Sequence, residues 1–376
     1  MIPVFRPSLG EAELSALRAV FKNGWVGLGP KTAEFEERFA AYIGVRHAVA
    51  VNSCTAALHL ALQVMGVEGG EVVTTPMTFV STSHAILYNR AHPVFADIEP
   101  DTLTIAADSV RERVTRRTRA ILVMHYGGHP CDMAPLLEIA HCRGLKVIED
   151  AAHGCGGEYR LRGRWRKLGS LGDIGCFSFQ AVKNLTTGDG GMITTNDARL
   201  AARLKKLRWM WISRGTWDRG LQKQRYEWAY EVEEVGYKYY MNDISAAIGL
   251  VQLKKLETMN RRRRMLAGAY TRAFSPCEQI ETPVEKPYAR SACHNYVIKV
   301  ARRNALIRHL NARGISAGVH YIPTYYFKAY ASYQARCPVT ERVWKRLVTL
   351  PLYYGLTQRQ QERVIRAVQE FKRDQG

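Results

Sequence analysis

Short apolar segments alternate with helix-like segments from residue 47 to about residue 200, and this alternation limits the fold more than any other feature of the sequence. The apolar segments are HAVAVN (47–52), EVVTTP (71–76), HPVFADI (92–98), TRAILVMHY (118–126), LKVIEDAA (145–152), DIGCFSF (173–179) and GMITTN (191–196). Strands that are apolar along most of their length are typical of a parallel sheet that helices cover on both faces. The pattern therefore predicts an α/β fold with a largely parallel sheet.

The pattern changes in the C-terminal part of the chain. A helix is predicted to begin near Asn242 and to end at about Arg264, on the basis of apolar residues at helical spacing. A predicted strand at 294–300 and a predicted helix at 304–315 follow, which indicates a small α+β domain. We predict a large domain with an N-terminal arm over residues 1–260 and a small C-terminal domain over residues 261–376.

Composition excludes several classes of protein. The chain has 376 residues, of which 47% are hydrophobic and 23% charged, as in a soluble globular protein. It contains no apolar run of membrane-spanning length, and its first residues lack a signal-peptide core. The cysteines are scattered without a metal-binding spacing, so we expect reduced thiols, a cytoplasmic protein and no metal site. They are Cys54, Cys131, Cys142, Cys155, Cys176, Cys277, Cys293 and Cys337.

The formal net charge of +20 raises the question of an anionic partner. The basic residues occur in separate runs at 110–120, 160–167 and 260–264, and no known nucleic-acid-binding motif accompanies them. Solvated helix faces and loops are the favoured interpretation. On this interpretation we expect no nucleic-acid partner and no membrane partner. The positive charge suits a small phosphorylated substrate.

One candidate site feature follows the first predicted strand, where Ser53, Cys54 and Thr55 lead into a helix. Free N–H groups at a helix N-terminus attract phosphate. Ser and Thr at such a position are also ordinary helix caps, so this feature alone does not establish a site.

Another candidate feature is the segment VIEDAAH, in which Asp150 ends an apolar strand and His153 follows three residues later. A buried carboxylate needs a partner that donates protons or carries positive charge. The residue either caps the following turn or is the counter-ion of a protonated ring nitrogen.

A lysine in the segment CFSFQAVKNLTTGDGG completes the pattern. Lys183 lies five residues after Ser178, near the end of a strand. Lys183 is either an ordinary surface lysine on a turn or an amine that forms a covalent bond. An amine, a phosphate site and an acidic counter-ion together match the needs of pyridoxal phosphate (PLP), with the lysine forming a Schiff base.

The chain resembles the DegT/DnrJ/EryC1/StrS family of PLP-dependent aminotransferases, and most closely its nucleotide-sugar 4-aminotransferase branch. The resemblance covers nearly the whole chain and implies PLP-dependent transferase fold type I, as in aspartate aminotransferase. The motifs that carry it are GWVGLGPKTAEFEERFAAYIG, NSCTAALHLAL, TPMTFVST, HYGGHPCDM, IEDAAHGCGGEY, GSLGDIGCFSFQAVKNLTTGDGGMI, GYKYYMNDISAAIGLVQL, GVHYIP and LPLYYGLT.

The resemblance implies a role for each matching residue. Lys183 would form the Schiff base and move protons, Asp150 would pair with the pyridine nitrogen, and His153 would lie beside the ring. The resemblance also implies that the phosphate is held by Ser53, Cys54, Thr55 and Ser178, that the ring stacks on Phe79, that a neighbouring subunit supplies Lys238 and Tyr240, and that His320 and Tyr321 line the substrate cleft.

Two residues and one segment depart from the family pattern. Cys54 replaces a usual glycine, and a backbone contact survives this change if the side chain points away. Tyr240 replaces a usual asparagine, which places its contact in doubt. The segment 209–231 is rich in tryptophan and basic residues where substrate-contacting loops vary, so it leaves the substrate open.

The resemblance implies transfer of an amino group from an amino acid, L-glutamate, to a keto-sugar nucleotide in a homodimer with shared sites, with pyridoxamine phosphate as the intermediate form of the cofactor. The lysine argues against a sugar dehydratase, because in the dehydratases of this fold histidine replaces it. A keto-cyclitol acceptor and a regulatory or nucleic-acid-binding relative remain alternatives.

Overall fold

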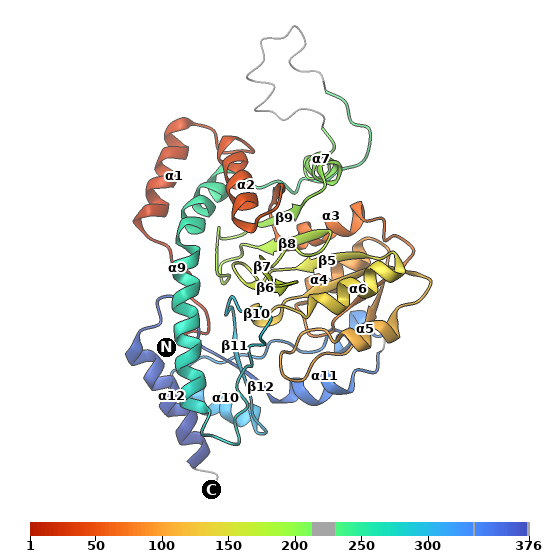
Figure 1. The fold of residues 1–376 in the computed structure, drawn as a ribbon. Coiled ribbons are helices and arrows are strands. Elements are labelled where there is room, and N and C mark those ends of the chain that lie inside the picture. Colours follow the sequence, from red (N-terminus) through yellow and green to blue (C-terminus); the bar gives the residue numbers. More distant parts are fainter. Residues whose placement is uncertain (213–229, 334, 374–376) are drawn as a thin grey trace.

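The computed structural model describes residues 1–212, 230–333 and 335–373. Most of the tryptophan-rich segment 209–231 therefore lies outside the described residues. Figure 1 shows a central sheet with helices on both faces and a long helix along one side of the molecule. None of the helices in these three ranges combines the length and the hydropathy needed to cross a bilayer.

Seven strands form the central sheet. They are β1 (His47–Val51), β2 (Glu71–Thr74), β3 (His92–Phe95), β4 (Thr118–Met124), β5 (Lys146–Asp150), β8 (Ile174–Ser178) and β9 (Gly191–Thr195). Their order is β1-β9-β8-β5-β4-β2-β3, and only β9 runs antiparallel to its neighbours. The predicted α/β fold with a largely parallel sheet is confirmed.

Helices cover the two faces of this sheet. They are α2 (Pro30–Ile43), α3 (Cys54–Val64), α4 (Val80–Tyr88), α5 (Ala107–Arg113), α6 (Met133–Arg143), α7 (Ala198–Leu207) and α9 (Asp243–Phe274), whereas α1 (Glu11–Asn23) packs against α9. One core lies under α3, α4 and α7, and two others lie under α5 and α6 and under α2 and α9. Successive residues of a strand point to opposite faces, so Val72 joins the first core and Val73 the second.

The C-terminal part packs around a core of its own. Its elements are β11 (Tyr296–Lys299), α10 (Arg303–Ala312), α11 (Pro338–Val343), β12 (Leu347–Leu350) and α12 (Gln358–Arg373). A three-stranded sheet is formed by β6 (Glu158–Leu161), β7 (Arg164–Lys167) and β10 (Ala289–Arg290). The N-terminus joins the C-terminal core, because Ile2 is buried there and its N–H donates to the Gly314 carbonyl at 2.8 Å.

The long helix α9 connects the two parts, and the prediction that it ends near Arg264 is wrong. It continues to Phe274 because Leu266, Tyr270 and Phe274, spaced four residues apart, are buried in the C-terminal core. The run of arginines masked this continuation, since Arg263 is itself buried and donates to the Leu352 carbonyl at 2.9 Å. The proposed division after residue 260 falls inside this helix.

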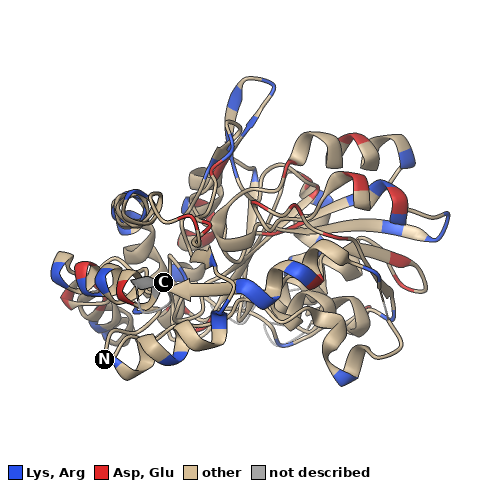
Figure 2. Ribbon diagram, turned by 90° about the horizontal axis from the view of Figure 1, so that it is seen from below, with Lys and Arg blue, Asp and Glu red and all other residues tan. Residues whose placement is uncertain are grey.

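The positions of Lys and Arg are spread over many helices and loops in the ribbon of Figure 2, and no single element carries them all. All eight cysteines are free thiols.

Candidate active site

Three predicted site residues lie at one edge of the sheet. Asp150 is the last residue of β5, Ser178 is the last residue of β8, and Ser53 follows β1 by two residues. β5 and β8 are parallel, and β1 runs in the same direction because both β1 and β8 are antiparallel to β9. The carboxyl ends of the three strands therefore meet at the edge where ligands bind in open α/β sheets.

Lys183 lies in the loop between β8 and β9 and is half-buried. Its backbone N–H donates to the Gln180 carbonyl at 2.9 Å, whereas its amine has no hydrogen bond or ion pair with any described residue. Burial lowers the pKa of this amine to about 8, against the opposing attraction of Asp150. About a tenth of the amine is then neutral at pH 7, far more than for an ordinary lysine.

Asp150 is buried and holds two hydrogen bonds. Its Oδ2 accepts from the Thr82 hydroxyl at 2.7 Å, and its Oδ1 accepts from the Ala152 N–H at 3.1 Å. The Thr82 oxygen lies 2.7 Å from the Thr78 hydroxyl, which extends the chain of hydrogen bonds. Burial raises the pKa of Asp150 even though these donors lower it. The remaining lone pairs can accept a further hydrogen bond, and a cationic N–H donor would stabilise the charge.

His153 is buried between the sheet edge and the C-terminal part. Its Nδ1 accepts from the Gly127 N–H at 3.3 Å, and burial lowers its pKa well below the usual value. The ring is therefore neutral with its proton on Nε2, which lies 3.1 Å from the Tyr321 hydroxyl. The ring of His294 lies against it with a centroid distance of 4.2 Å.

Tyr321 joins His153 to the predicted substrate residues. Its ring lies 6.2 Å from that of Phe79, which is 58% exposed and offers an open aromatic surface. The neighbouring His320 bonds the Thr349 hydroxyl through Nδ1 at 2.8 Å, and burial lowers its pKa to about 4.

The start of α3 lies beside the same edge. Ser53 caps this helix, with its Oγ accepting from the Ala56 N–H at 3.1 Å, while Cys54 points its thiol into the core. The backbone N–H groups of Cys54 and Thr55 belong to the first turn and have no partner within the helix. A Cβ at Gly191 would lie 2.6 Å from the Ser53 carbonyl, so only glycine lets β9 pack this closely against the start of the helix.

Lys238 and Tyr240 lie close to this end of the sheet in the chain's own fold. The Asn52 N–H donates to the Tyr239 carbonyl at 2.7 Å, which fixes the segment beside β1. Lys238 is exposed, and the Tyr240 ring packs edge-on against Trp209 with a centroid distance of 4.6 Å. The Ser178 hydroxyl is buried, and within the described ranges it accepts one long bond, of 3.4 Å, from the Gln180 N–H.

The sequence patterns did not identify a cluster of amides next to the lysine. Asn184 donates to Asn260 Oδ1 and to the Ala292 carbonyl, both at 2.8 Å, and its Oδ1 lies 3.1 Å from His294 Nδ1. These contacts tie the Lys183 loop to α9 and to the C-terminal part. The adjacency of Asn184 to Lys183 was the only signal in the sequence, because its three partners lie 76, 108 and 110 residues away.

The residues at this edge fit pyridoxal phosphate. This cofactor requires four groups that the described residues provide: an amine that bonds none of them and has a lowered pKa, a buried carboxylate with free lone pairs, an exposed aromatic face and an open helix N-terminus.

Changing Asp150 to asparagine is expected to weaken PLP binding by about 10- to 150-fold, because a charge-assisted hydrogen bond contributes roughly 1.5–3 kcal/mol. The dissociation constant is measured by equilibrium dialysis. The matched control is Asp97→Asn, since Asp97 is a buried carboxylate after β3 that accepts from the N–H groups of Val339 and Thr340, both at 2.8 Å. Equal PLP affinity in Asp150→Asn and wild type would show that Asp150 is purely structural.

Comparisons with known proteins agree with this geometry. The chain is 41% identical to the spore coat polysaccharide biosynthesis protein SpsC of Bacillus subtilis, over 98% of this chain and 97% of SpsC. The crystal structure of the sugar aminotransferase CalS13 from Micromonospora echinospora matches with a TM-score of 0.90 and 32% identity, over 98% of this chain and 100% of CalS13. The PLP form of Spr1654 from Streptococcus pneumoniae matches with a TM-score of 0.91 and 27% identity, over 99% of each chain.

The model of the DegT/DnrJ/EryC1/StrS aminotransferase family matches residues 7–369. This match and the identity to SpsC confirm the family that the motifs predicted. The chain is an aminotransferase and belongs to the DegT/DnrJ/EryC1/StrS family.

Proposed function

We propose that this protein uses pyridoxal phosphate to transfer the amino group of L-glutamate to a keto-sugar nucleotide. The observation that carries the proposal is the half-buried amine of Lys183, which bonds no described residue and whose pKa burial lowers while the charge of the buried Asp150 carboxylate raises it. The names of SpsC and CalS13 support a sugar acceptor. The net charge of +20 supports an acceptor that carries phosphate.

Each residue then has a defined task. Bound pyridoxal phosphate supplies an aldehyde that takes up an amino group and a ring that withdraws electrons. Asp150 would hold the ring nitrogen through its free lone pairs, and His153, neutral and buried, would pack beside the ring. The Nζ of Lys183 would take a proton from the amino-acid α-carbon and pass it to the cofactor, and would do the reverse with the acceptor; taking the proton requires the neutral amine. The start of α3 binds the phosphate through the N–H groups of Cys54 and Thr55.

We also propose a homodimer in which the segment around Lys238 completes the site of the other subunit. The exposure of Lys238 supports this arrangement, because its amine is available to an external phosphate. The free cysteines support a reducing compartment such as the cytoplasm.

The proposal is tested with enzyme loaded with pyridoxamine phosphate and mixed with a panel of keto-sugar nucleotides, the corresponding free keto sugars and a keto-cyclitol. We expect at least one keto-sugar nucleotide to convert the cofactor to its aldehyde form, with a new amino sugar detected by mass spectrometry. Conversion by the keto-cyclitol alone would establish that alternative, and a protein that takes up no PLP but binds DNA would establish the regulatory one.

The rate of covalent PLP capture by the cofactor-free enzyme is expected to depend on the lowered pKa of Lys183. Only the neutral amine attacks the aldehyde, so the rate should rise about tenfold per pH unit below pH 8 and level off above it. Stopped-flow absorbance measures this rate. A rise that continues to pH 10 would show that the amine has an ordinary lysine pKa.

A further inference from the structure

Asn184, the residue after Lys183, is buried and uses both N–H groups and the oxygen of its amide. Its nitrogen donates to Asn260 Oδ1 and to the Ala292 carbonyl, both at 2.8 Å. Because both N–H groups are taken, its oxygen must accept the third hydrogen bond, which comes from His294 Nδ1 at 3.1 Å. His294 therefore carries a proton on Nδ1 and donates it to the loop that holds Lys183.

The backbone of His294 is fixed on both sides. Its N–H donates to the Gly127 carbonyl at 2.9 Å, and its carbonyl accepts from Arg263 Nη1 at 3.5 Å. The Gly127 N–H donates in turn to His153 Nδ1 at 3.3 Å. His294 is thus joined to the Lys183 loop by its side chain and to His153, through Gly127, by its backbone.

The ring of His294 is packed against two other rings. Phe5 of the N-terminal arm stacks on it with a centroid distance of 5.4 Å and an interplanar angle of 6°, and the His153 ring lies at 4.2 Å. His294 is only 2% exposed. A buried ring with two such neighbours has little space in which to rotate. Its Nδ1 is therefore held in place to donate to Asn184.

The titratable side chains that act on the Lys183 amine are one carboxyl, one thiol and three imidazoles. They are Asp150, Cys54, His153, His294 and His320. Burial raises the pKa of the thiol and lowers the pKa of each histidine, so these four groups are uncharged at neutral pH. Burial also lowers the pKa of Lys183 to about 8. Movement of the amine toward water would raise this pKa toward its ordinary value.

We propose that His294 is a positioning residue for amino-group transfer, and that its hydrogen bond to Asn184 holds the loop so that the Lys183 amine stays buried near Asp150. His294 acts on Lys183 through Asn184. Because His294 lies two residues before β11, the same bond ties the C-terminal part of the chain to the lysine. This role rests on the proposed attachment of PLP to Lys183.

The rate of covalent PLP capture by the cofactor-free protein tests this role, with stopped-flow measurements from about pH 6 to about pH 10. His294→Phe keeps a ring but cannot donate to Asn184, and Asn184→Ala removes the acceptor. We expect each variant to slow capture at pH 8 by about 10- to 100-fold, because a misplaced reacting group loses rate on this order. The pH at which the rate levels off should rise above 8, since the amine becomes more hydrated. In the half-reaction with glutamate, kcat should fall more than KM changes.

The double variant His294→Phe/Asn184→Ala shows whether the two residues act as a unit. Each single variant breaks the same hydrogen bond, so the double variant should capture PLP no more slowly than the slower single variant. His294→Asn, whose amide nitrogen can replace Nδ1, should lie closer to wild type than His294→Phe in both rate and pH dependence. Single effects that multiply in the double variant overturn the proposal, and so does a His294→Asn protein that is as slow as His294→Phe.

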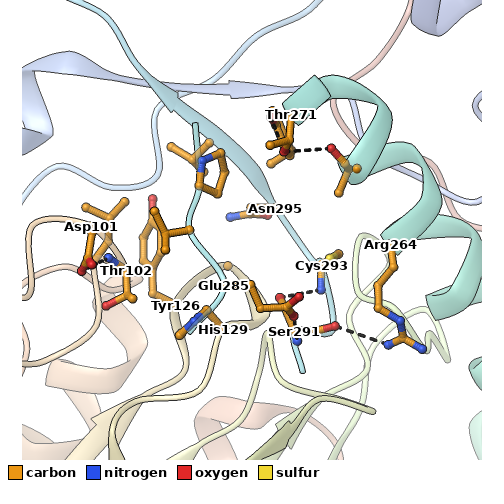
Figure 3. A pocket seen from close by; sticks show the side chains of 18 of the residues that line it. Asp101, Thr102, Tyr126, His129, Arg264, Thr271, Glu285, Ser291, Cys293 and Asn295 are labelled. Atoms are coloured by element: carbon orange, nitrogen blue, oxygen red, sulfur yellow. Dashed lines mark hydrogen bonds between the residues drawn. The ribbon is translucent and has the colours of Figure 1, made fainter. Parts of the chain in front are cut away.

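His129→Phe is the matched control for loss of a buried imidazole. His129 Nδ1 donates to the Pro130 carbonyl at 2.8 Å, and its Nε2 accepts from the Lys286 N–H at 3.2 Å. His129 lies next to Tyr126 in the wall of a pocket of about 430 Å³ (Figure 3), which neither His294 nor Lys183 lines. This variant is expected to lower the Tm and to leave PLP capture and its pH dependence unchanged. An equal shift in His129→Phe would indicate a general loosening of the fold and would overturn the proposal.

Failure of this role and failure of the proposed function give different results. If wild type captures no PLP, both are overturned. If wild type captures PLP and both His294→Phe and Asn184→Ala do so with unchanged rate and pH dependence, the positioning role alone is overturned. Thermal denaturation checks that the variants fold. If His294→Phe does not fold, Asn184→Ala decides the test, and an unchanged pH dependence in that variant overturns the role of His294.

Discussion

Replacing Lys183 with alanine is expected to lower the rate of amino-group transfer by at least about 10³-fold, because one side chain supplies both the covalent attachment and the proton transfer. The fold should survive, since the amine makes no hydrogen bond or ion pair with the described residues. The half-reaction with glutamate is measured by absorbance, and borohydride reduction followed by mass spectrometry detects the covalent link to PLP.

Lys183→Arg is the matched control for charge. It keeps a cation in the loop, but a guanidinium stays protonated and cannot attack an aldehyde, so this variant should be as inactive as Lys183→Ala. Added methylamine should restore part of the proton transfer in the alanine variant. Substantial turnover by Lys183→Ala without added amine would contradict the role assigned to this residue.

The fold was predictable because the strands of the central sheet are short and apolar. Most strands of this sheet, such as β2, β4, β8 and β9, are buried on both faces, so their apolar composition distinguishes them from the helices. The end of α9 was not predictable in the same way. This helix passes from one core to another at its run of arginines. A search for one continuous apolar face therefore places the end of the helix at the arginines.

The candidate site was predictable where a charged residue follows an apolar strand, because few structural roles explain a charge at that position. Asp150 after an apolar strand, and Lys183 between a strand and a glycine-rich turn, are such cases. Thr82 and Asn184 are not, because threonine and asparagine are common and their partners are distant in sequence. Thr82 reaches Asp150 across 68 residues and Asn184 reaches His294 across 110, so only the folded chain brings each pair together.

The position of Lys238 allows two arrangements of the active site. The backbone around it is bonded to Asn52, one residue before Ser53, so its amine could serve the phosphate of its own chain. Its exposed side chain could equally serve a second subunit, as we propose. Alanine at Lys238 and Tyr240 together is expected to remove activity in either arrangement, because the phosphate loses its cation and a hydroxyl.

Mixing this double variant with Lys183→Ala distinguishes the two arrangements. If sites are shared, a mixed dimer has one site in which Lys183 comes from one chain and Lys238 from the other. Random exchange then restores about a quarter of the wild-type specific activity, because half of the dimers are mixed and half of their sites are intact. Mass spectrometry of the intact dimers verifies that subunits have exchanged.

Lys345→Ala serves as the control in the same mixture, because Lys345 is an exposed lysine of the C-terminal part. Alone, this variant should keep full activity. Mixed with Lys183→Ala, it should give about half of the wild-type specific activity, because half of the sites contain Lys183 and every chain supplies Lys238. Exchange without any recovery in the test mixture would place Lys238 at the site of its own chain. Full activity of the double variant by itself would remove both residues from the site, and the N–H groups at the start of α3 would then bind the phosphate without them.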